Sequence, residues 1–368
     1  MKNQLVLRLV FFAFISVLFW SCNQKNTEDA DVKSFEADVR TLMLDFIEKS
    51  NVPGMGFAFY SDSIGTITLA VGTADVKKNM PFETGTHYPI QSVTKMFISI
   101  LTIQIIEEGK LTLESTIDQW VDGVPELSHI TIKHLLQHTS GLKNYPSSFG
   151  DEYFSNSHKI FTRNDIINAA LAIPYNIDDF GKFNYTNTNF LILANIIEEI
   201  THHSIGQELG IRIFHPAEMH DTYYKPEITD DKHDIVQSYI DGYQLDMDRS
   251  NFLSNAAGGI ASTLEDMIKF GHWILDNEYY TPLSSDLIGE ISFDGRILFN
   301  YGLGFCVMTT ELFNTKVMGH GGSNGGNSHE FYISRETGEI IIFFYNGGNS
   351  KESYSFREKL GTLFQKYR

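Results

Sequence analysis

Positive charge and cysteine are both scarce in this chain. Its 368 residues include 28 Lys and Arg against 46 Asp and Glu, a formal net charge of −18. Proteins that bind nucleic acids carry a basic face, so this balance argues against a nucleic-acid partner. The chain has 2 cysteines, Cys22 and Cys306. Because Cys22 belongs to the N-terminal segment described next, we expect no intrachain disulfide, and the fold must rest on its hydrophobic core.

The apolar run at residues 9–20 is shorter than the about 20 residues that a transmembrane helix needs. It follows Lys2 and Arg8 and precedes Ser21-Cys22. This arrangement resembles a bacterial lipoprotein signal, in which Cys22 becomes the lipidated first residue. We predict a signal over residues 1–21, a polar tether over 22–33, and lipid anchorage in the bacterial cell envelope, periplasmic or on the membrane surface. An uncleaved signal anchor and ordinary secretion are the alternatives.

The chain also lacks a regular alternation of strands and helices, which argues against a doubly wound parallel sheet. The patterns predict a helix over 32–50 and a hairpin over 56–60 and 66–71. Further helical patterns cover residues 93–108, 132–138, 163–172, 189–200, 205–214 and about 263–275. Strand patterns cover residues 301–309, 315–318, 330–333 and 340–345, and a last helix covers 353–365. This order predicts one mixed α/β (α+β) domain, residues 34–368, whose antiparallel sheet comes from the N- and C-terminal parts and whose central region is mostly helical.

The candidate nucleophile is a serine at the start of the 93–108 helix. Ser92 and Lys95 form the pattern S-x-x-K, which a chain of this length contains about once by chance. The helix N-terminus favours negative charge on Ser92, and Lys95 lies one turn on, a geometry that can activate a serine without a histidine. A second copy, Ser140 to Lys143, has Gly141 directly after the serine and resembles a helix stop. The alternative for Ser92 is a helix cap beside a solvated lysine.

Other patterns do not point to a second site. Residues 321–325 match G-x-S-x-G, but that elbow needs a helix after the serine, and a strand pattern follows here. His134 and His138 have helical spacing but lack the glutamate of H-E-x-x-H, so we expect a helix-end role, no metal and no cofactor. Cys306, in an apolar strand pattern, is expected to be a buried structural thiol.

Two later motifs agree with Ser92 in order along the chain. Tyr185-Thr186-Asn187 is the sole Y-x-N, and His320-Gly321-Gly322 lies between strand patterns. With Ser92 and Lys95 they resemble the serine β-lactamase/penicillin-binding-protein superfamily, on its class C β-lactamase-related side. Segments 130–142, 214–219 and 257–263 also resemble segments of that family, and the likeness spans about 39–346. It implies the β-lactamase/transpeptidase-like fold.

The resemblance implies roles for the motif residues. Ser92 would attack a carbonyl while Lys95 and Tyr185 manage its proton, and Asn187 would hydrogen-bond the substrate amide. For this chemistry we expect burial to lower the pKa of Lys95 and the lysine cation to lower that of Tyr185. The backbone N–H groups of Ser92 and Ser323 are the expected oxyanion hole.

The third motif carries the departure from the family pattern. Gly321 and Gly322 would let the backbone approach the substrate, because glycine has no side chain. His320 stands where β-lactamases of this group usually have lysine. The resemblance therefore predicts a serine hydrolase for a D-amino-acid, cell-wall-type peptide or a small ester, of the carboxypeptidase, D-aminopeptidase or esterase type. The alternatives are a β-lactamase and a lipoprotein that binds or senses cell-wall peptides or β-lactams without turnover.

Overall fold

The computed structural model describes residues 31–121, 127–145, 161–227, 235–244, 255–277, 287–291, 299–310, 315–347 and 350–367. The predicted signal, the predicted lipidation site Cys22 and most of the predicted tether lie outside these ranges. Residues 31–50 form one helix, so the last three residues predicted as tether are helical. None of the helices in the described ranges combines the length and the apolar character needed to cross a bilayer.

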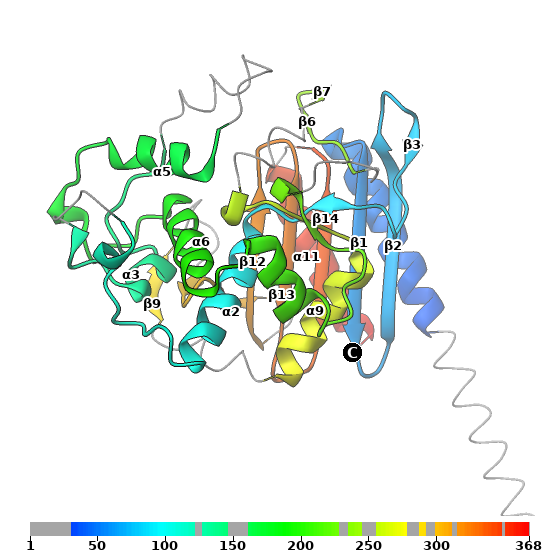
Figure 1. Cartoon of the computed structure of the whole chain (residues 1–368). Coiled ribbons are helices and arrows are strands. Elements are labelled where there is room, and N and C mark those ends of the chain that lie inside the picture. Colours follow the sequence, from blue (N-terminus) through cyan, green and yellow to red (C-terminus); the bar gives the residue numbers. More distant parts are fainter. Residues whose placement is uncertain are drawn as a thin grey trace, which may run out of the picture.

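A nine-stranded antiparallel sheet forms the centre of the molecule, in the order β3-β2-β1-β14-β13-β12-β11-β10-β9 (Figure 1). Its strands are β1 (Gly54–Ser61), β2 (Gly65–Asp75), β3 (Met80–Pro81), β9 (Ile288–Ile291), β10 (Phe299–Tyr301), β11 (Cys306–Thr310), β12 (Thr315–Ser323), β13 (Ser328–Ile333) and β14 (Ile340–Tyr345). The first strand of the chain pairs with the last, with Phe57 opposite Phe343. The prediction of one antiparallel sheet built from both ends of the chain is therefore confirmed.

The other elements surround this sheet. Two small sheets are formed by β4 (Tyr88–Pro89), β8 (Ile260–Ser262) and β5 (Tyr223–Tyr224), and by β6 (Tyr239–Ile240) with β7 (Tyr243–Gln244). The α-helices after the N-terminal one are α2 (Thr94–Glu107), α3 (Ile132–Leu136), α5 (Arg163–Leu171), α6 (Thr188–Thr201), α7 (Ile205–Leu209), α9 (Leu264–Asp276) and α11 (Ser350–Tyr367). Short turns of helix are η1 (Gln91–Val93), η2 (Ile117–Gln119), η4 (Ile177–Asp179), η5 (Gly210–Phe214), η6 (Lys225–Glu227) and η7 (Asn255–Ala257).

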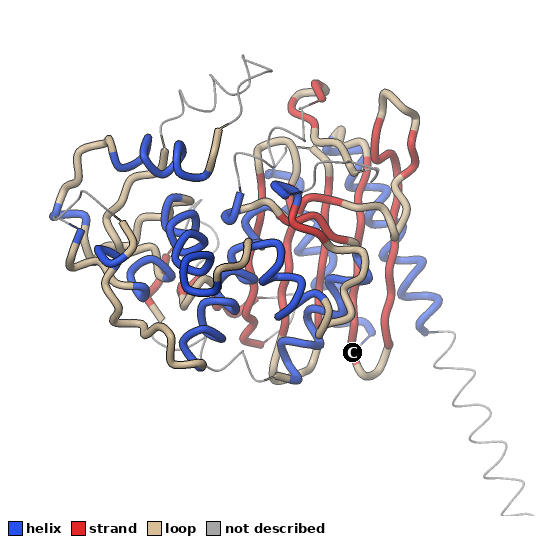
Figure 2. The backbone as a smooth tube through the Cα atoms, in the orientation of Figure 1, coloured by secondary structure: helices blue, strands red, loops and turns tan. Residues whose placement is uncertain are grey.

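Both faces of the sheet are covered, which gives two apolar layers (Figure 2). On one face the 31–50 helix and α11 pack through residues such as Phe35 and Phe364. On the other face lie α2, α6 and α9, with the helical region beyond them, at the left of Figure 1. Alternate side chains of a strand point to opposite faces, so β14 is apolar at every position from Ile340 to Tyr345.

The apolar run at 301–309 forms two strands and not the single one predicted. Gly304 lies between β10 and β11 at φ +85°, and Gly302 N–H donates to Phe305 O at 2.8 Å to close the turn. A β-carbon on Gly304 would collide with the hydroxyl of Ser99 on α2, so the turn is pressed against that helix. Further on, β12 is longer than its apolar pattern, because it continues through the His320-Gly321-Gly322 motif to Ser323.

Candidate active site

Ser92 lies in η1, at the entry to α2, where its side chain is half-buried. The residue before it, Gln91, has φ +48°, an uncommon value for a residue other than glycine. The cap position of α2 is Val93, which makes no side-chain cap. Ser92 is thus not the helix cap, and Lys95 is not solvated as that alternative requires, because its side chain is completely buried.

Lys95 Nζ has three oxygen atoms around it. It lies 3.1 Å from Ser92 Oγ, 2.9 Å from Asn187 Oδ1 and 2.8 Å from Ala257 O. The amide and backbone carbonyls can only accept hydrogen bonds. A neutral amine that donates to both of them has its lone pair left for the Ser92 hydroxyl. Burial holds the pKa of Lys95 well below its usual value, which favours this neutral form, and no carboxylate in the described part of the chain opposes the shift.

Tyr185 and Asn187 lie on the segment that enters α6, and residues 138–144 hold that segment in place. The supporting residues 138–144 follow shortly after α3. The hydroxyl of Tyr185 forms a hydrogen bond with the side chain of Ser92. The hydrogen bonds run from Gly181 N–H to Thr139 O (2.9 Å), Asn184 N–H to His138 O (2.8 Å), Thr186 N–H to His138 Nδ1 (3.2 Å), Asn187 N–H to Asn144 Oδ1 (3.2 Å) and Thr188 Oγ1 to Lys143 O (2.8 Å). Residues from two distant parts of the chain thus act as one support for the motif.

The predicted direction of the Tyr185 pKa is not the one that the structure gives. Burial of the phenol raises its pKa, and the hydrogen bond with Ser92 only partly opposes this effect. The ring does lie against Lys95, with Nζ 4.9 Å from its centre. Burial also lowers the pKa of Lys95 and so disfavours the cation on which the expected shift of Tyr185 depends. Tyr185 is therefore a neutral phenol that can donate, and Lys95 is the basic group of the pair.

His320 projects from β12 toward the Ser92 helix. Its Nδ1–H donates to the carbonyl of Gly321, and its Nε2 accepts from the hydroxyl of Tyr301 at 3.2 Å. Burial lowers the pKa of His320 to about 3, so the imidazole is neutral at pH 7. A β-lactamase-type lysine at this place would carry a permanent charge, which the histidine does not supply.

The two glycines of the motif face opposite sides of β12. A β-carbon on Gly322 would lie 2.5 Å from Ile90 O and 3.0 Å from Ser92 N, so the strand touches the backbone of η1 here. The next residue is Ser323, whose N–H remains the predicted partner of the Ser92 N–H in an oxyanion hole. On Gly321 the nearest neighbour of an added β-carbon is His329 O at 3.9 Å. A side chain at position 321 would therefore point away from Ser92. Of the two glycines, Gly322 is the one whose lack of a side chain allows the close approach to η1, and Gly321 can contribute only through its backbone.

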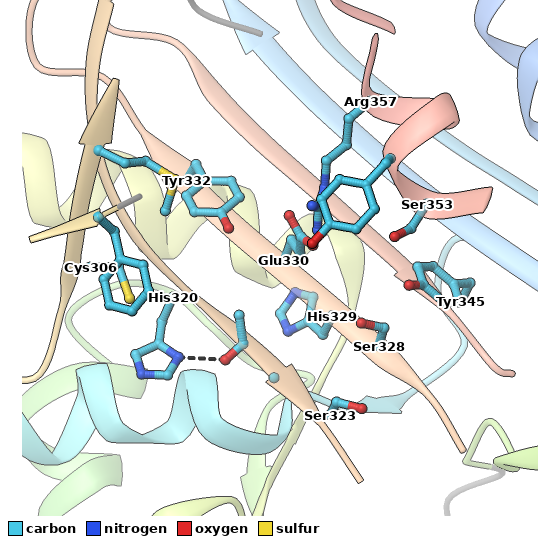
Figure 3. A pocket seen from close by; sticks show the side chains of 15 residues that line it. Cys306, His320, Ser323, Ser328, His329, Glu330, Tyr332, Tyr345, Ser353 and Arg357 are labelled. Atoms are coloured by element: carbon cyan, nitrogen blue, oxygen red, sulfur yellow. Dashed lines mark hydrogen bonds and ion pairs between the residues drawn. The ribbon is translucent and has the colours of Figure 1, made fainter. Parts of the chain in front are cut away.

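The far side of β12 and β13 has a cavity of about 300 Å³, closed by α11 (Figure 3). His320, Cys306 and Tyr332 are among the residues that line this space, and in Figure 3 the ring of His320 lies near the helix that carries Lys95. Glu330 and Arg357 form an ion pair in its wall. Cys306 is buried and free, as predicted. Residues 320–323 of β12 also line this cavity, so it adjoins the third motif of the site, while Ser92 is not among the described residues that line it.

The rejected candidates have structural roles. Ser140 is completely buried, and its hydroxyl donates to Asn189 Oδ1 at 2.7 Å. This hydrogen bond ties the 138–144 segment to α6. Ser323 Oγ donates to Asn327 O in the β12–β13 hairpin, and a strand follows it. His134 caps α3 through its Nδ1, which accepts from Thr131 N–H at 3.1 Å. Within the described ranges no cluster of three or more His, Cys, Asp or Glu side chains is placed to hold a metal ion.

Sequence reasoning missed three contributors. The carbonyl of Ala257 binds Lys95, and Tyr301 orients His320. The side chain of Tyr145 hydrogen-bonds that of Asn187. The segments that hold Ala257 and precede Tyr145 were noticed as resembling the family, but no role could be read from them, because backbone carbonyls and aromatic rings have no distinctive spacing.

Comparison with known proteins agrees with this geometry. The protein-family model described as Beta-lactamase matches residues 38–364. Penicillin-binding protein 4* of Bacillus subtilis is 25% identical over 279 residues, 70% of this chain and 60% of that protein. Protein flp of Staphylococcus aureus is 27% identical over 217 residues, 57% of this chain and 41% of that protein. The chain thus spans less than two thirds of the length of each of these relatives.

Solved structures show the same fold. D-amino acid amidase from Ochrobactrum anthropi SV3 superposes with a TM-score of 0.79 at 21% identity, covering 91% of this chain and 100% of that one. A penicillin-binding protein from Bacillus halodurans gives 0.72 at 21% identity, covering 88% and 99%. With a family match over most of its length, this chain belongs to the beta-lactamase family, in the superfamily that it shares with the penicillin-binding proteins.

Proposed function

We propose that this protein is a serine hydrolase that forms an acyl-enzyme on Ser92 with an amide or ester substrate. One observation carries the proposal: Lys95 is completely buried, two fixed carbonyl oxygens occupy its N–H groups, and its remaining position faces Ser92 Oγ at 3.1 Å. A solvated lysine has no such arrangement. A buried neutral amine beside a hydroxyl is a general base for that hydroxyl.

The residues divide the chemistry as follows. Lys95 takes the proton of Ser92 as its oxygen bonds to the substrate carbonyl carbon, and the carbonyl oxygen becomes an oxyanion. The backbone N–H groups of Ser92 and Ser323 stabilise this charge, an effect worth about 3 kcal/mol per donor in other hydrolases. When the bond to the leaving group breaks, Tyr185 gives that group a proton and recovers one from the Lys95 ammonium. Water then attacks the acyl-enzyme while Lys95 takes one of its protons. The Lys95 ammonium returns this proton to Ser92 Oγ as the bond between Oγ and the acyl carbon breaks, which frees the carboxylic acid and restores the neutral amine.

The substrate class follows from the neutral surroundings of Ser92. His320 has both ring nitrogens engaged by Tyr301 and Gly321 and carries no charge at pH 7. A substrate with a carboxylate beside its scissile bond, such as a penicillin or a D-Ala-D-Ala peptide, gains no ion pair from it. We therefore infer a D-amino-acid amide or a small ester whose leaving group is uncharged. The fold likeness to a D-amino acid amidase supports the same class.

A covalent probe tests the reaction. A fluorescent fluorophosphonate should label the wild-type protein, and peptide mapping should place the label on Ser92 and not on Ser140, the serine of the second S-x-x-K. The Ser92→Ala variant should remain unlabelled. An unlabelled wild type, or equal label on Ser92→Ala, would contradict the hydrolase and favour a lipoprotein that only binds cell-wall peptides.

A substrate panel tests the specificity. D-phenylalanine amide and p-nitrophenyl acetate should be turned over faster than a D-Ala-D-Ala peptide or nitrocefin. Turnover of nitrocefin alone would make the protein a β-lactamase and overturn the role given to His320.

We also propose that the protein acts in the cell envelope, anchored through a lipid on Cys22. The support is the order of charge, apolar run and cysteine at residues 1–22. Cells fed a clickable palmitate analogue should label the wild-type protein, and Cys22→Ala should lose the label and leave the membrane fraction. Labelling that persists in Cys22→Ala would contradict the anchor.

A further inference from the structure

His138 is a buried histidine beside the active site that the reaction above does not use. It follows α3 with φ +57° and is completely buried. Four aromatic rings enclose its imidazole, with centroid distances of 4.3 Å to Tyr185, 5.1 Å to Tyr301, 5.3 Å to Phe190 and 6.0 Å to Phe183. The shortest of these distances is to the tyrosine that contacts the nucleophile.

The polar atoms of His138 hold both neighbours of Tyr185. The carbonyl of His138 accepts from Asn184 N–H at 2.8 Å, and its Nδ1 accepts from Thr186 N–H at 3.2 Å. One residue therefore fixes the backbone before and after Tyr185 and also packs on its ring. The phenol has few remaining ways to turn, so its hydroxyl stays directed at Ser92.

We propose that His138 is the positioning residue for Tyr185, a neutral imidazole whose Nδ1 acceptor and ring face hold the phenol against Ser92. The inference rests on the proposed hydrolase function and adds to it a residue that touches neither substrate nor reacting atoms.

The charge state of His138 fits this role. A protonated Nδ1 could not accept from Thr186, so the proton of the neutral ring lies on Nε2. The titratable groups that face the ring are Lys95 of α2, Tyr185, Tyr301 of β10 and His320 of β12. Burial lowers the pKa of His138 well below its usual value. The imidazole therefore remains an acceptor throughout the neutral pH range.

Two variants separate the functions of the side chain. In His138→Asn the amide Oδ1 takes the place of Nδ1, and asparagine tolerates a positive φ better than most residues. In His138→Phe the ring remains but the acceptor is lost, which leaves Thr186 N–H without its partner. Leu360→Ala is the matched stability control, because Leu360 is completely buried in α11 on the opposite face of the sheet.

The first readout is the rate of fluorophosphonate labelling of Ser92, measured well below the melting temperature of each variant. A displacement of about 1 Å in a catalytic group costs up to about 100-fold. We expect His138→Phe to lose about 10- to 100-fold, His138→Asn to stay within about fivefold of wild type, and Leu360→Ala to lose stability without losing rate. In a Tyr185→Phe background His138→Phe should have little further effect, since the phenol that it positions is gone. An undiminished rate in His138→Phe, or the same loss with and without the Tyr185 hydroxyl, would overturn the proposal.

The second readout does not need a reactive serine. Hydrogen exchange, followed by mass spectrometry, should show the peptide containing residues 184–188 protected in wild type and His138→Asn and fast in His138→Phe. Equal protection in all three would overturn the positioning role by itself. If the wild type is unlabelled but this exchange pattern holds, the hydrolase is wrong and the support by His138 stands.

Discussion

Gly322 and Ser92 are in backbone contact: a β-carbon on Gly322 would lie 3.0 Å from Ser92 N. The contact joins β12, which comes late in the chain, to the turn that presents the nucleophile. The contact fixes how closely β12 approaches η1, and Ser323, whose N–H is the proposed partner of the Ser92 N–H, directly follows it. The proposed oxyanion hole thus depends on the absence of one side chain.

Adding that side chain is the first test. Gly322→Ala should push β12 away from η1 and reduce the labelling rate of Ser92 by about 100-fold, the usual effect of losing an oxyanion donor. Gly321→Ala is the matched control, since its β-carbon points to the far cavity and meets nothing closer than 3.9 Å. Neither glycine has a positive φ within the described ranges, so alanine fits both backbones. Equal rates in the two variants would show that the Gly322 contact does not set the site.

Replacing Lys95 by methionine keeps its length and removes its basic nitrogen. Loss of a general base typically costs about 10²–10⁴-fold, and we expect a decrease of that size in Lys95→Met. The substitution leaves Asn187 Oδ1 and Ala257 O without their donor, at a cost of about 1–3 kcal/mol each if no water replaces it. Melting curves must therefore accompany the rate measurements. A folded Lys95→Met protein that labels at the wild-type rate would assign the base to another group.

The wild-type labelling rate should rise with pH along a single limb. The reactive form has Lys95 neutral, and burial sets the pKa of that amine well below its usual value, so the midpoint must fall well below 10.5. Tyr185, whose pKa burial raises, stays protonated across the range and adds no falling limb below pH 10. A fluorophosphonate progress curve at each pH measures this. A midpoint at the ordinary pKa of lysine would mean that Lys95 is solvated.

How far the sequence could predict the site is clear from Lys95. The spacing from Ser92 and the apolar residues around it left a solvated lysine open, and the prediction of a buried amine beside a hydroxyl depended on the Tyr185-Thr186-Asn187 and His320-Gly321-Gly322 motifs and the family resemblance that they carry. The carbonyl of Ala257, 162 positions further along the chain, could not be predicted. This hydrogen bond depends on how the η7 turn packs against α2, and no local sequence pattern specifies that packing.

Two predictions were wrong: the direction of the Tyr185 pKa shift, and the single strand over residues 301–309. The direction of a pKa shift depends on whether burial or a neighbouring charge dominates. How deeply the Tyr185 phenol is buried cannot be deduced from the sequence. Similarly, the apolar character of residues 301–309 is the same for one strand and for two. What breaks the run is the approach of Gly304 to Ser99, a contact between segments about 200 positions apart.

Acid should destabilise the folded protein through two buried histidines. Burial lowers the pKa of His320 and of His329 to about 3, whereas unfolded histidine titrates near 6.5. Between these values the unfolded chain binds more protons, so stability is fully present above pH 6.5 and is lost as the pH falls toward 3. Each histidine contributes a slope of up to about 1.4 kcal/mol per pH unit.

Urea unfolding at pH 7, 5.5 and 4 measures this dependence. His329→Phe removes one of the two groups in a buried position beside Tyr88, so its free energy of unfolding should fall less steeply between pH 6.5 and 4 than that of wild type. An unchanged slope would show that His329 is protonated in the folded state.

Thiol counting tests the two cysteines together. Cys306 is 5% exposed, and burial raises its pKa, so the native protein should not react with Ellman's reagent, which needs an accessible thiolate. If Cys22 carries a lipid on its sulfur, protein extracted from membranes should show one thiol per chain after unfolding in urea, and Cys306→Ser should show none. Two thiols in the unfolded wild type would contradict lipidation of Cys22. Rapid reaction of Cys306 in the native protein would mean that the cavity behind β12 opens to solvent.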